Sequence, residues 1–158
     1  RLGTNLRMTE MQAAIGIIQI EKLDSWISKR KKNAMILYDY LKDISCIRIP
    51  LPNEDKTHAW YKFYVYLKIS YLKTEWNRDR IIERLSKYNL PSYYGSCSEI
   101  YLEKGIKNYK IAGENERLPI SEELGNTSLM FLVNPNITDD QINFYGEKIR
   151  ETLLKASK

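Results

Sequence analysis

The sequence predicts an α+β domain, with a three-stranded, mainly antiparallel sheet, helices packed on one face of it and a long N-terminal helix. Two patterns carry this prediction. Apolar residues recur at helical spacing over 9–43 and again over 138–153, whereas residues 58–69 alternate between two faces as a half-buried strand does. Shorter extended segments at 90–94 and 128–133 supply two more strands. Three strands under a helical cover can form a stable layer.

The first helix begins with a sequence typical of an N-cap. Thr9 can accept a hydrogen bond from an unpaired backbone amide, and Gln12 stands three residues on, which completes a capping box. We expect the helix to cover about 9–43, on the order of 50 Å. Its apolar spacing loosens over 25–32, and we expect any break there. A helix of this length usually bridges two bodies or bends around one.

The strand predicted over 58–69 has a mixed face and an apolar face. The mixed face carries Trp60, Lys62, Tyr64, Tyr66 and Lys68. The apolar face carries Tyr61, Phe63, Val65, Leu67 and Ile69. The single histidine, His58, is interpreted as a structural residue at the start of this strand.

Cap and breaker residues bound the remaining elements. These are a helix over 78–88 capped by Asn77 and stopped before Pro91, a short helical piece at 99–104, a helix over 119–124 closed by Gly125, a turn at 134–136, and a last helix capped by Thr138 with Gln141 as the second half of its capping box.

The composition is that of a soluble globular domain. The 158 residues are 43% hydrophobic and 28% charged, with no apolar run long enough to span a bilayer and no signal-peptide pattern. Two distant cysteines and one histidine make neither a disulfide framework nor a metal-ligand cluster, which fits a reducing cytoplasm. We therefore expect a cytoplasmic protein with no metal site and no membrane partner.

The net charge is 25 − 20 = +5, with a basic run at 29–32. Such a run can bind phosphates, but it is more often the solvated face of a helix. Together with twelve tyrosines it leaves open a stand-alone basic module that binds nucleic acid or protein, although no RNP-like motif accompanies it. A steep loss of nucleic-acid affinity with added salt would favour that module.

Two polar side chains stand just before the first cap. Asn5 and Arg7 place an amide and a guanidinium beside a helix start, where backbone amides point outward. This chemistry suits a phosphate or a carboxylate. The alternative is local, with Asn5 shaping the turn and Arg7 paired with Glu10.

The segment over residues 3–24 reads GTNLRMTEMQAAIGIIQIEKLD. It resembles the segment that enters the C-terminal domain of the pyridoxal-phosphate (PLP)-dependent nucleotide-sugar aminotransferases of the DegT/DnrJ/StrS type. Their pattern is Gly-x-Asn-x-Arg-Met-x-Glu-x-Gln-Ala-Ala-Ile-Gly followed by Gln-Leu-x-x-Leu-Asp, and only Ile20 departs from it, conservatively. Residues 58–63, 95–104 and 123–133 also resemble this family in order, so the resemblance covers nearly the whole chain.

The resemblance implies that residues 1–158 are the C-terminal small domain of a larger aminotransferase whose PLP-binding large domain is absent. A start at Arg1, inside a motif, fits a piece of a larger protein. The Schiff-base lysine would belong to the large domain, so no catalytic residue is expected here, and the fragment alone is expected to be inactive and not to bind PLP. In similar enzymes the positions of Asn5 and Arg7 reach the PLP phosphate of the partner subunit.

Substrate-binding residues are also implied by the resemblance. Tyr94, Ser96 and Tyr101 lie in a region that, in similar enzymes, is near the entrance for the nucleotide sugar, although a tight turn flanked by packing aromatics explains them slightly better. Cys97 in the same turn is interpreted as a buried small residue. Asn134 stands where the family usually has a histidine that faces the active site. It can donate a hydrogen bond but cannot titrate near neutral pH.

The whole protein would transfer an amino group, with glutamate as the expected donor, to a nucleotide-linked keto-deoxysugar for polysaccharide or glycan synthesis. The resemblance implies a homodimer and no nucleic-acid partner. A sugar dehydratase of the same family, which uses PLP for dehydration, is the close alternative. The missing lysine region would decide between the two.

Overall fold

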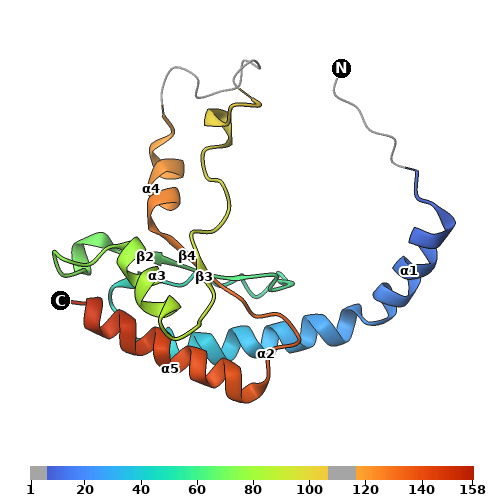
Figure 1. Cartoon of the computed structure of the whole chain (residues 1–158), viewed down its shortest axis with the longest axis horizontal. Helices are drawn as coiled ribbons and strands as arrows, with labels where there is room; N and C mark the ends of the chain where they lie inside the picture. Colours follow the sequence, from blue (N-terminus) through green and yellow to red (C-terminus); the bar gives the residue numbers. More distant parts are fainter. Residues whose placement is uncertain (1–6, 107–116) are drawn as a thin grey trace.

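A computed structural model describes residues 7–106 and 117–158 of the chain (Figure 1). The described residues form five α-helices and four β-strands. The helices are α1 (Glu10–Glu21), α2 (Leu23–Leu41), α3 (Arg78–Ser86), α4 (Pro119–Thr127) and α5 (Asp139–Ala156). The strands are β1 (Ile47–Arg48), β2 (Phe63–Leu67), β3 (Ser92–Tyr93) and β4 (Ser128–Phe131), and short 3-10 helices occupy Ile69–Tyr71 and Ile100–Leu102. The predicted α+β class is confirmed.

The sheet is antiparallel throughout, with the strand order β1-β2-β4-β3. Its centre is the pair β2 and β4, in which Val65 lies opposite Leu129. The sequence predicted three strands, and the additional one is β1. β1 pairs with β2 through two residues, including Ile47 opposite Leu67. A strand this short cannot show an alternating pattern.

One face of the sheet is covered by α2 and α5, which lie side by side, with α3 packed against α5 (Figure 1). Phe63, Val65 and Leu67 of β2 belong to this core and are at most 4% exposed. Tyr64 and Tyr66 between them stay partly exposed on the opposite face. The predicted alternation is therefore confirmed within β2, where burial of every second side chain removes apolar surface from water.

α2 and α5 approach closely at Gly146 of α5. A Cβ atom on Gly146 would lie 2.3 Å from Cδ2 of Tyr40 in α2. The absence of a side chain thus lets the Tyr40 ring rest against the backbone of α5, and a larger residue would have to displace the ring.

The long helix is divided at Lys22, several residues before the predicted break. The amide of Lys22 donates to the carbonyl of Gln19 (3.2 Å), a tight turn that ends α1 and begins α2. Ser25 donates its hydroxyl to the carbonyl of Lys22 (2.8 Å) on the other side of this turn. The break was misplaced because the apolar spacing does not reveal the local hydrogen bonds that end a helix.

The strand predicted from residue 58 begins only at Phe63. Trp60 has a left-handed backbone (φ 48°) that turns its ring into the core, where it is 5% exposed and its centroid lies 6.0 Å from that of Phe63. The prediction that Trp60 shares the mixed face is therefore wrong, because alternation holds only while the backbone stays extended. Nδ1 of His58 accepts a hydrogen bond from the amide of Trp60 (2.9 Å), in keeping with a structural role for His58.

The predicted caps of the later helices are confirmed. Asn77 caps α3, and Thr138 and Gln141 form the capping box of α5. Gly125 does not close α4 as predicted, since the helix continues to Thr127. A Cβ on Gly125 would lie 2.0 Å from Oγ of Ser98, so close packing explains this glycine.

Among the described helices, none has the length and apolarity to cross a bilayer.

Phe63→Ala should lower the free energy of unfolding by about 3–5 kcal/mol, because it empties a fully buried site. Tyr61→Ala, two residues earlier on the predicted apolar face, should cost no more than about 0.5 kcal/mol, because Tyr61 is 68% exposed. Urea denaturation followed by circular dichroism measures both. A larger loss for Tyr61→Ala would contradict the position of the core.

Candidate functional site

The start of α1 keeps the predicted capping box. The amide of Thr9 donates to Oε1 of Gln12 (2.9 Å), and the amide of Gln12 donates to Oγ1 of Thr9 (3.3 Å). Arg7 lies two residues before this cap and is exposed, while Asn5 lies outside the described residues. Binding of a phosphate by Asn5 and Arg7 stays a prediction.

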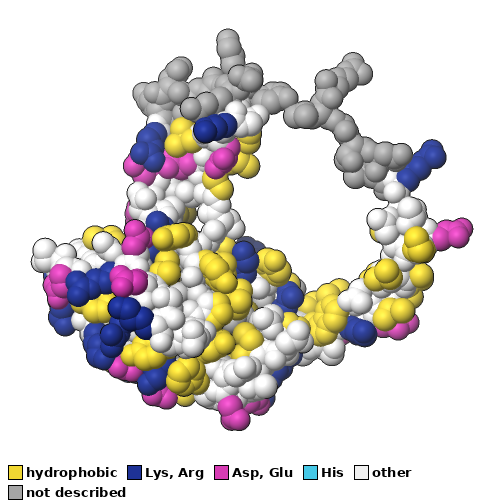
Figure 2. Space-filling model, viewed as in Figure 1, with side chains coloured by type: hydrophobic (Ala, Val, Ile, Leu, Met, Phe, Trp, Pro, Cys, Tyr) yellow, Lys and Arg dark blue, Asp and Glu magenta, His cyan; other side chains and the backbone are white. Residues whose placement is uncertain are grey.

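α1 extends away from the rest of the molecule and buries none of its residues (Figures 1 and 2). Its apolar side chains face solvent, with Met11 79%, Ile15 62% and Ile20 71% exposed. A helix that is apolar on several sides is usually buried in a larger structure, and exposed apolar surface of this extent marks an interaction site.

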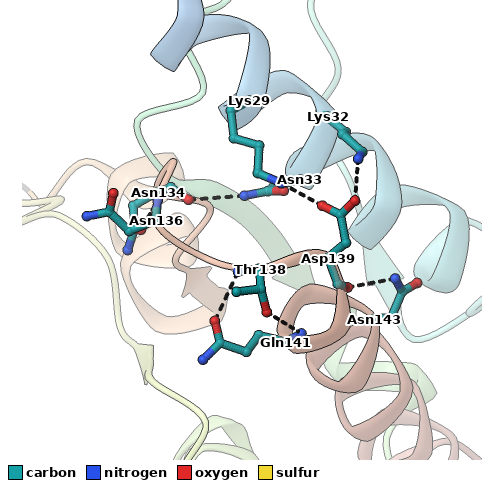
Figure 3. Close-up of polar contacts among 9 residues, drawn as sticks. All are labelled: Lys29, Lys32, Asn33, Asn134, Asn136, Thr138, Asp139, Gln141 and Asn143. Atoms are coloured by element: carbon teal, nitrogen blue, oxygen red, sulfur yellow. Dashed lines mark hydrogen bonds and ion pairs between the residues drawn. The ribbon is translucent and has the colours of Figure 1, made fainter.

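The turn after β4 is held by hydrogen bonds to α2 and within itself (Figure 3). Nδ2 of Asn33, in α2, donates to the carbonyl oxygen of Asn134 (3.0 Å), which also accepts from the amide of Ile137 (3.3 Å). Oδ1 of Asn134 accepts from the amide of Asn136 (3.0 Å). The NH₂ group of half-buried Asn134 makes no hydrogen bond within the part of the chain that the structure describes, so it is available to an acceptor.

Two lysines of the basic run contact the first residue of α5 (Figure 3). Nζ of Lys29 and Nζ of Lys32 each lie 2.5 Å from a different carboxylate oxygen of Asp139. These hydrogen bonds, that from Lys29 first, hold the pKa of Asp139 at about 2, below its ordinary 3.8. At neutral pH the pair of lysines therefore ties α2 to the N-terminus of α5, beside the turn that carries Asn134.

A hydroxyl-lined pocket of about 360 Å³ lies on the face of the sheet opposite α2 and α5. Its lining includes Tyr64, Tyr66, Ser96, Ser98, Ser121 and Ser128. The hydroxyls of Tyr64 and Ser96 lie 3.1 Å apart. Gly95, with φ 101°, permits this approach, because a Cβ there would lie 2.8 Å from the Tyr64 ring. Ser96 therefore lines a pocket with polar groups that suit sugar or phosphate oxygens.

Tyr94 stands outside this pocket, and its ring is half exposed. The guanidinium of Arg78 lies 4.5 Å from the centroid of that ring and donates to the carbonyl of Gly125 in α4. The hydroxyl of Ser128 donates to the carbonyl of Tyr94 (2.5 Å). Arg78 thus helps to position the Tyr94 ring. Sequence patterns could not reveal this contact, because it joins residues far apart in the chain.

Tyr101 is buried, and its hydroxyl already has two partners. It donates to Oε1 of Glu99 (2.7 Å) and accepts from the amide of Leu118 (3.0 Å). Arg117 pairs with both Glu99 and Glu122. Hydrogen bonds from Arg117 and then Tyr101 lower the pKa of Glu99. This network joins residues 99–101 to residues 117 and 118. A substrate contact by Tyr101 stays a prediction, and these hydrogen bonds do not favour it because they already engage the hydroxyl.

Cys97 is exposed, which contradicts the expectation that it is buried. Its Sγ lies 3.3 Å from Oε1 of Glu103, and this hydrogen bond is the main cause that raises the pKa of the thiol. A raised pKa lowers the thiolate fraction, so Cys97 is not an activated nucleophile.

The described residues contain no cluster of His, Cys, Asp and Glu that could hold a metal ion.

The structure does not bring the predicted substrate residues together. Ser96 lies near the start of β4, since Ser128 contacts the residue before Gly95. Asn134 follows the other end of that strand, and an extended chain from 128 to 134 spans about 20 Å. A single ligand that touched both residues would have to extend along this strand.

Comparison with known proteins decides the family. Residues 1–150 match the model of the DegT/DnrJ/EryC1/StrS aminotransferase family. The chain belongs to this family. Pyridoxal phosphate is the cofactor of its enzymes. An aminotransferase from Psychrobacter cryohalolentis has 40% identity to the chain and a TM-score of 0.89, over 99% of this chain and 41% of that one.

Two further relatives differ in their reactions. GDP-perosamine synthase from Escherichia coli O157:H7 is 26% identical, over 95% of this chain and 38% of its own length. GDP-4-keto-6-deoxy-D-mannose-3-dehydratase from Escherichia coli, solved with bound hydrated PLP, shares the fold with a TM-score of 0.75 and 23% identity, over 96% of this chain and 36% of that one. The chain spans about two fifths of the length of these relatives.

The contact of Asp139 with Lys29 and Lys32 predicts a specific pH dependence. Because folding lowers the pKa of Asp139 from 3.8 to about 2, this carboxylate stabilises the fold above pH 4, and the contribution is lost as the pH falls toward 2. Asp139→Asn should therefore lower Tm at pH 7, less so in high salt, and the difference from the wild type should vanish near pH 2. Asp140→Asn, whose carboxylate makes no ion pair among the described residues, is the matched control. An equal Tm decrease in both variants would contradict the assignment.

Proposed function

We propose that residues 1–158 are the C-terminal small domain of a larger PLP-dependent nucleotide-sugar aminotransferase. The observation that carries the proposal is α1, an apolar helix with no buried residue. In water an exposed apolar helix is unfavourable, so it is expected to pack against another body. The large domain and the partner subunit of a homodimer are the surfaces that we propose for it.

The described residues fit one end of the cofactor. Arg7 supplies a cation just before a helix N-terminus, which suits the PLP phosphate, and Asn5 would add an amide donor. We propose that the Schiff-base lysine belongs to the large domain and not to this chain. When bound, PLP supplies the electron sink for the transfer. The role that we propose for this chain is to hold the phosphate and to position the substrate, and the fragment alone is proposed to be inactive.

The proposed reaction moves an amino group from an amino acid, with glutamate as the proposed donor, to a nucleotide-linked keto-deoxysugar for polysaccharide or glycan synthesis in the cytoplasm. The names of two relatives, a GDP-perosamine synthase and a GDP-4-keto-6-deoxy-D-mannose-3-dehydratase, support the sugar-nucleotide class. Ser96, in its hydroxyl-lined pocket, and the NH₂ group of Asn134 are the proposed contacts for substrate oxygens, with Tyr94 at the rim and Tyr101 as the weakest candidate. The dehydratase alternative shares this fold, so the fold does not separate the two reactions.

The stand-alone nucleic-acid module is less well supported. Lys29 and Lys32, two of the four cations of the basic run, contact Asp139. A third, Arg30, lies 5.5 Å from the ring centroid of Tyr61. Contacts within the domain therefore engage three cations of the run, which was predicted to be a solvated helix face, and they leave fewer cations for nucleic acid.

In the complete protein, Arg7→Ala should weaken PLP binding about ten- to a hundredfold, because a charged hydrogen bond to phosphate contributes on the order of 1.5–3 kcal/mol. Titration of the apoprotein with PLP, followed by absorbance, measures the Kd. Lys22→Ala, which removes an exposed cation at the other end of α1, is the control and should leave the Kd unchanged. An unchanged Kd for Arg7→Ala would contradict the proposed contact of Arg7 with the PLP phosphate. In a separate experiment, PLP is added to residues 1–158 alone. An absorbance band of lysine-linked PLP in this chain would contradict the proposal that the catalytic lysine lies in the large domain.

A further inference from the structure

Asn33 is a buried side chain whose hydrogen bonds are only half satisfied. It lies near the middle of α2, next to the buried core residue Ala34, and is 0% exposed. Its Nδ2 donates to the carbonyl of Asn134, whereas its Oδ1 is buried and has no hydrogen-bond partner among the residues that the structure describes. An amide that leaves a buried acceptor unpaired loses its hydration without full compensation.

Stability alone does not explain an asparagine at this position. Leucine, which has the same branching as asparagine but bulkier ends, would leave no buried polar atom of its own unsatisfied. The carbonyl of Asn134 would keep its second partner, the amide of Ile137 at 3.3 Å. Replacing Asn33 by leucine should therefore cost little or even stabilise the fold. The hydrogen bond to the carbonyl of Asn134 is therefore what distinguishes asparagine from leucine at this position.

That bond ties the turn at 134–136 to α2 (Figure 3). It fixes the orientation of the peptide that follows Asn134, and the hydrogen bond from the Asn136 amide fixes the Asn134 side chain through its Oδ1. With Oδ1 occupied, the amide plane is set and its NH₂ group is the part left without a bond among the described residues. The lysine contacts with Asp139 hold the following helix to the same face of α2.

We propose that Asn33 is a positioning residue, which holds this turn so that the NH₂ group of Asn134 is aimed at an acceptor oxygen of the bound substrate. The proposal rests on the proposed function, in which Asn134 contacts substrate. The ligand chemistry is an anionic or carbonyl oxygen, which either the amino-acid donor or the sugar nucleotide can supply. Asn33 itself touches neither.

The first test uses the 158-residue chain and the variant Asn33→Leu. We expect Tm to be unchanged or higher, while the NMR order parameters of the Asn136 and Ile137 amides fall from about 0.85 to below about 0.6. Thr127→Val, which removes a buried hydroxyl that donates to the carbonyl of Glu123 (2.8 Å) far from the turn, is the control and should leave these order parameters unchanged. An equally ordered turn in Asn33→Leu would overturn the proposal.

The second test uses the complete enzyme and compares Asn33→Leu, Asn134→Ala and the double variant. We expect each single variant to raise KM for one substrate about tenfold with a smaller change in kcat, and the double variant to be no worse than Asn134→Ala, because both changes remove the same contact. The substrate whose KM rises identifies the source of the oxygen.

The outcomes of the second test separate the two claims. If Asn134→Ala raises KM and Asn33→Leu does not, the positioning role is overturned and the proposed function stands. If neither variant changes KM while the enzyme transfers amino groups to nucleotide sugars, Asn134 does not contact substrate and the positioning role is again overturned. An enzyme with no such activity would contradict the proposed function itself.

Discussion

The packing of α2 against α5 beneath the sheet is the contact on which the rest of the structure depends. The two helices meet where Gly146 leaves room for the Tyr40 ring, and their buried side chains fill the core under Phe63, Val65 and Leu67. The N-terminal end of α2 extends past this core to α1 (Figure 1). The exposed apolar helix α1 is therefore attached to the domain through α2. One face of α2 also contacts the turn after β4 and the start of α5, about a hundred residues later in the chain. The position of α2 therefore determines where both segments lie.

Much of the fold could be predicted because it is encoded locally. The capping boxes at Thr9 and Thr138 and the alternation within β2 depend on residues a few positions apart, and each has the predicted position. The features that the sequence did not reveal depend on distant contacts or on unusual backbone. Trp60 enters the core through a left-handed φ, and Gly125 is small because Ser98 packs against it. Neither contact leaves a periodic signal.

The candidate site was predictable only as a set of residue types. The resemblance pointed to Asn134, Ser96 and Tyr101, and the structure gives each a different environment. The NH₂ group of Asn134 is left for an acceptor, Ser96 lines a hydroxyl pocket, and the Tyr101 hydroxyl is engaged by Glu99 and Leu118. Ser96 and Asn134 lie near opposite ends of β4, so under the proposed function they would contact different parts of a substrate.

Hydrogen–deuterium exchange of α1 tests most directly whether this chain is a small domain that packs against a larger body. In the isolated 158-residue chain, the amides of α1 should exchange much faster than those in the buried half of α2, because isolated short helices open readily. In the complete protein, the amides of α1 should slow at least tenfold while those of α2 change little. Equal exchange of α1 in both forms would contradict the account, since it would leave the apolar helix uncovered in the working protein.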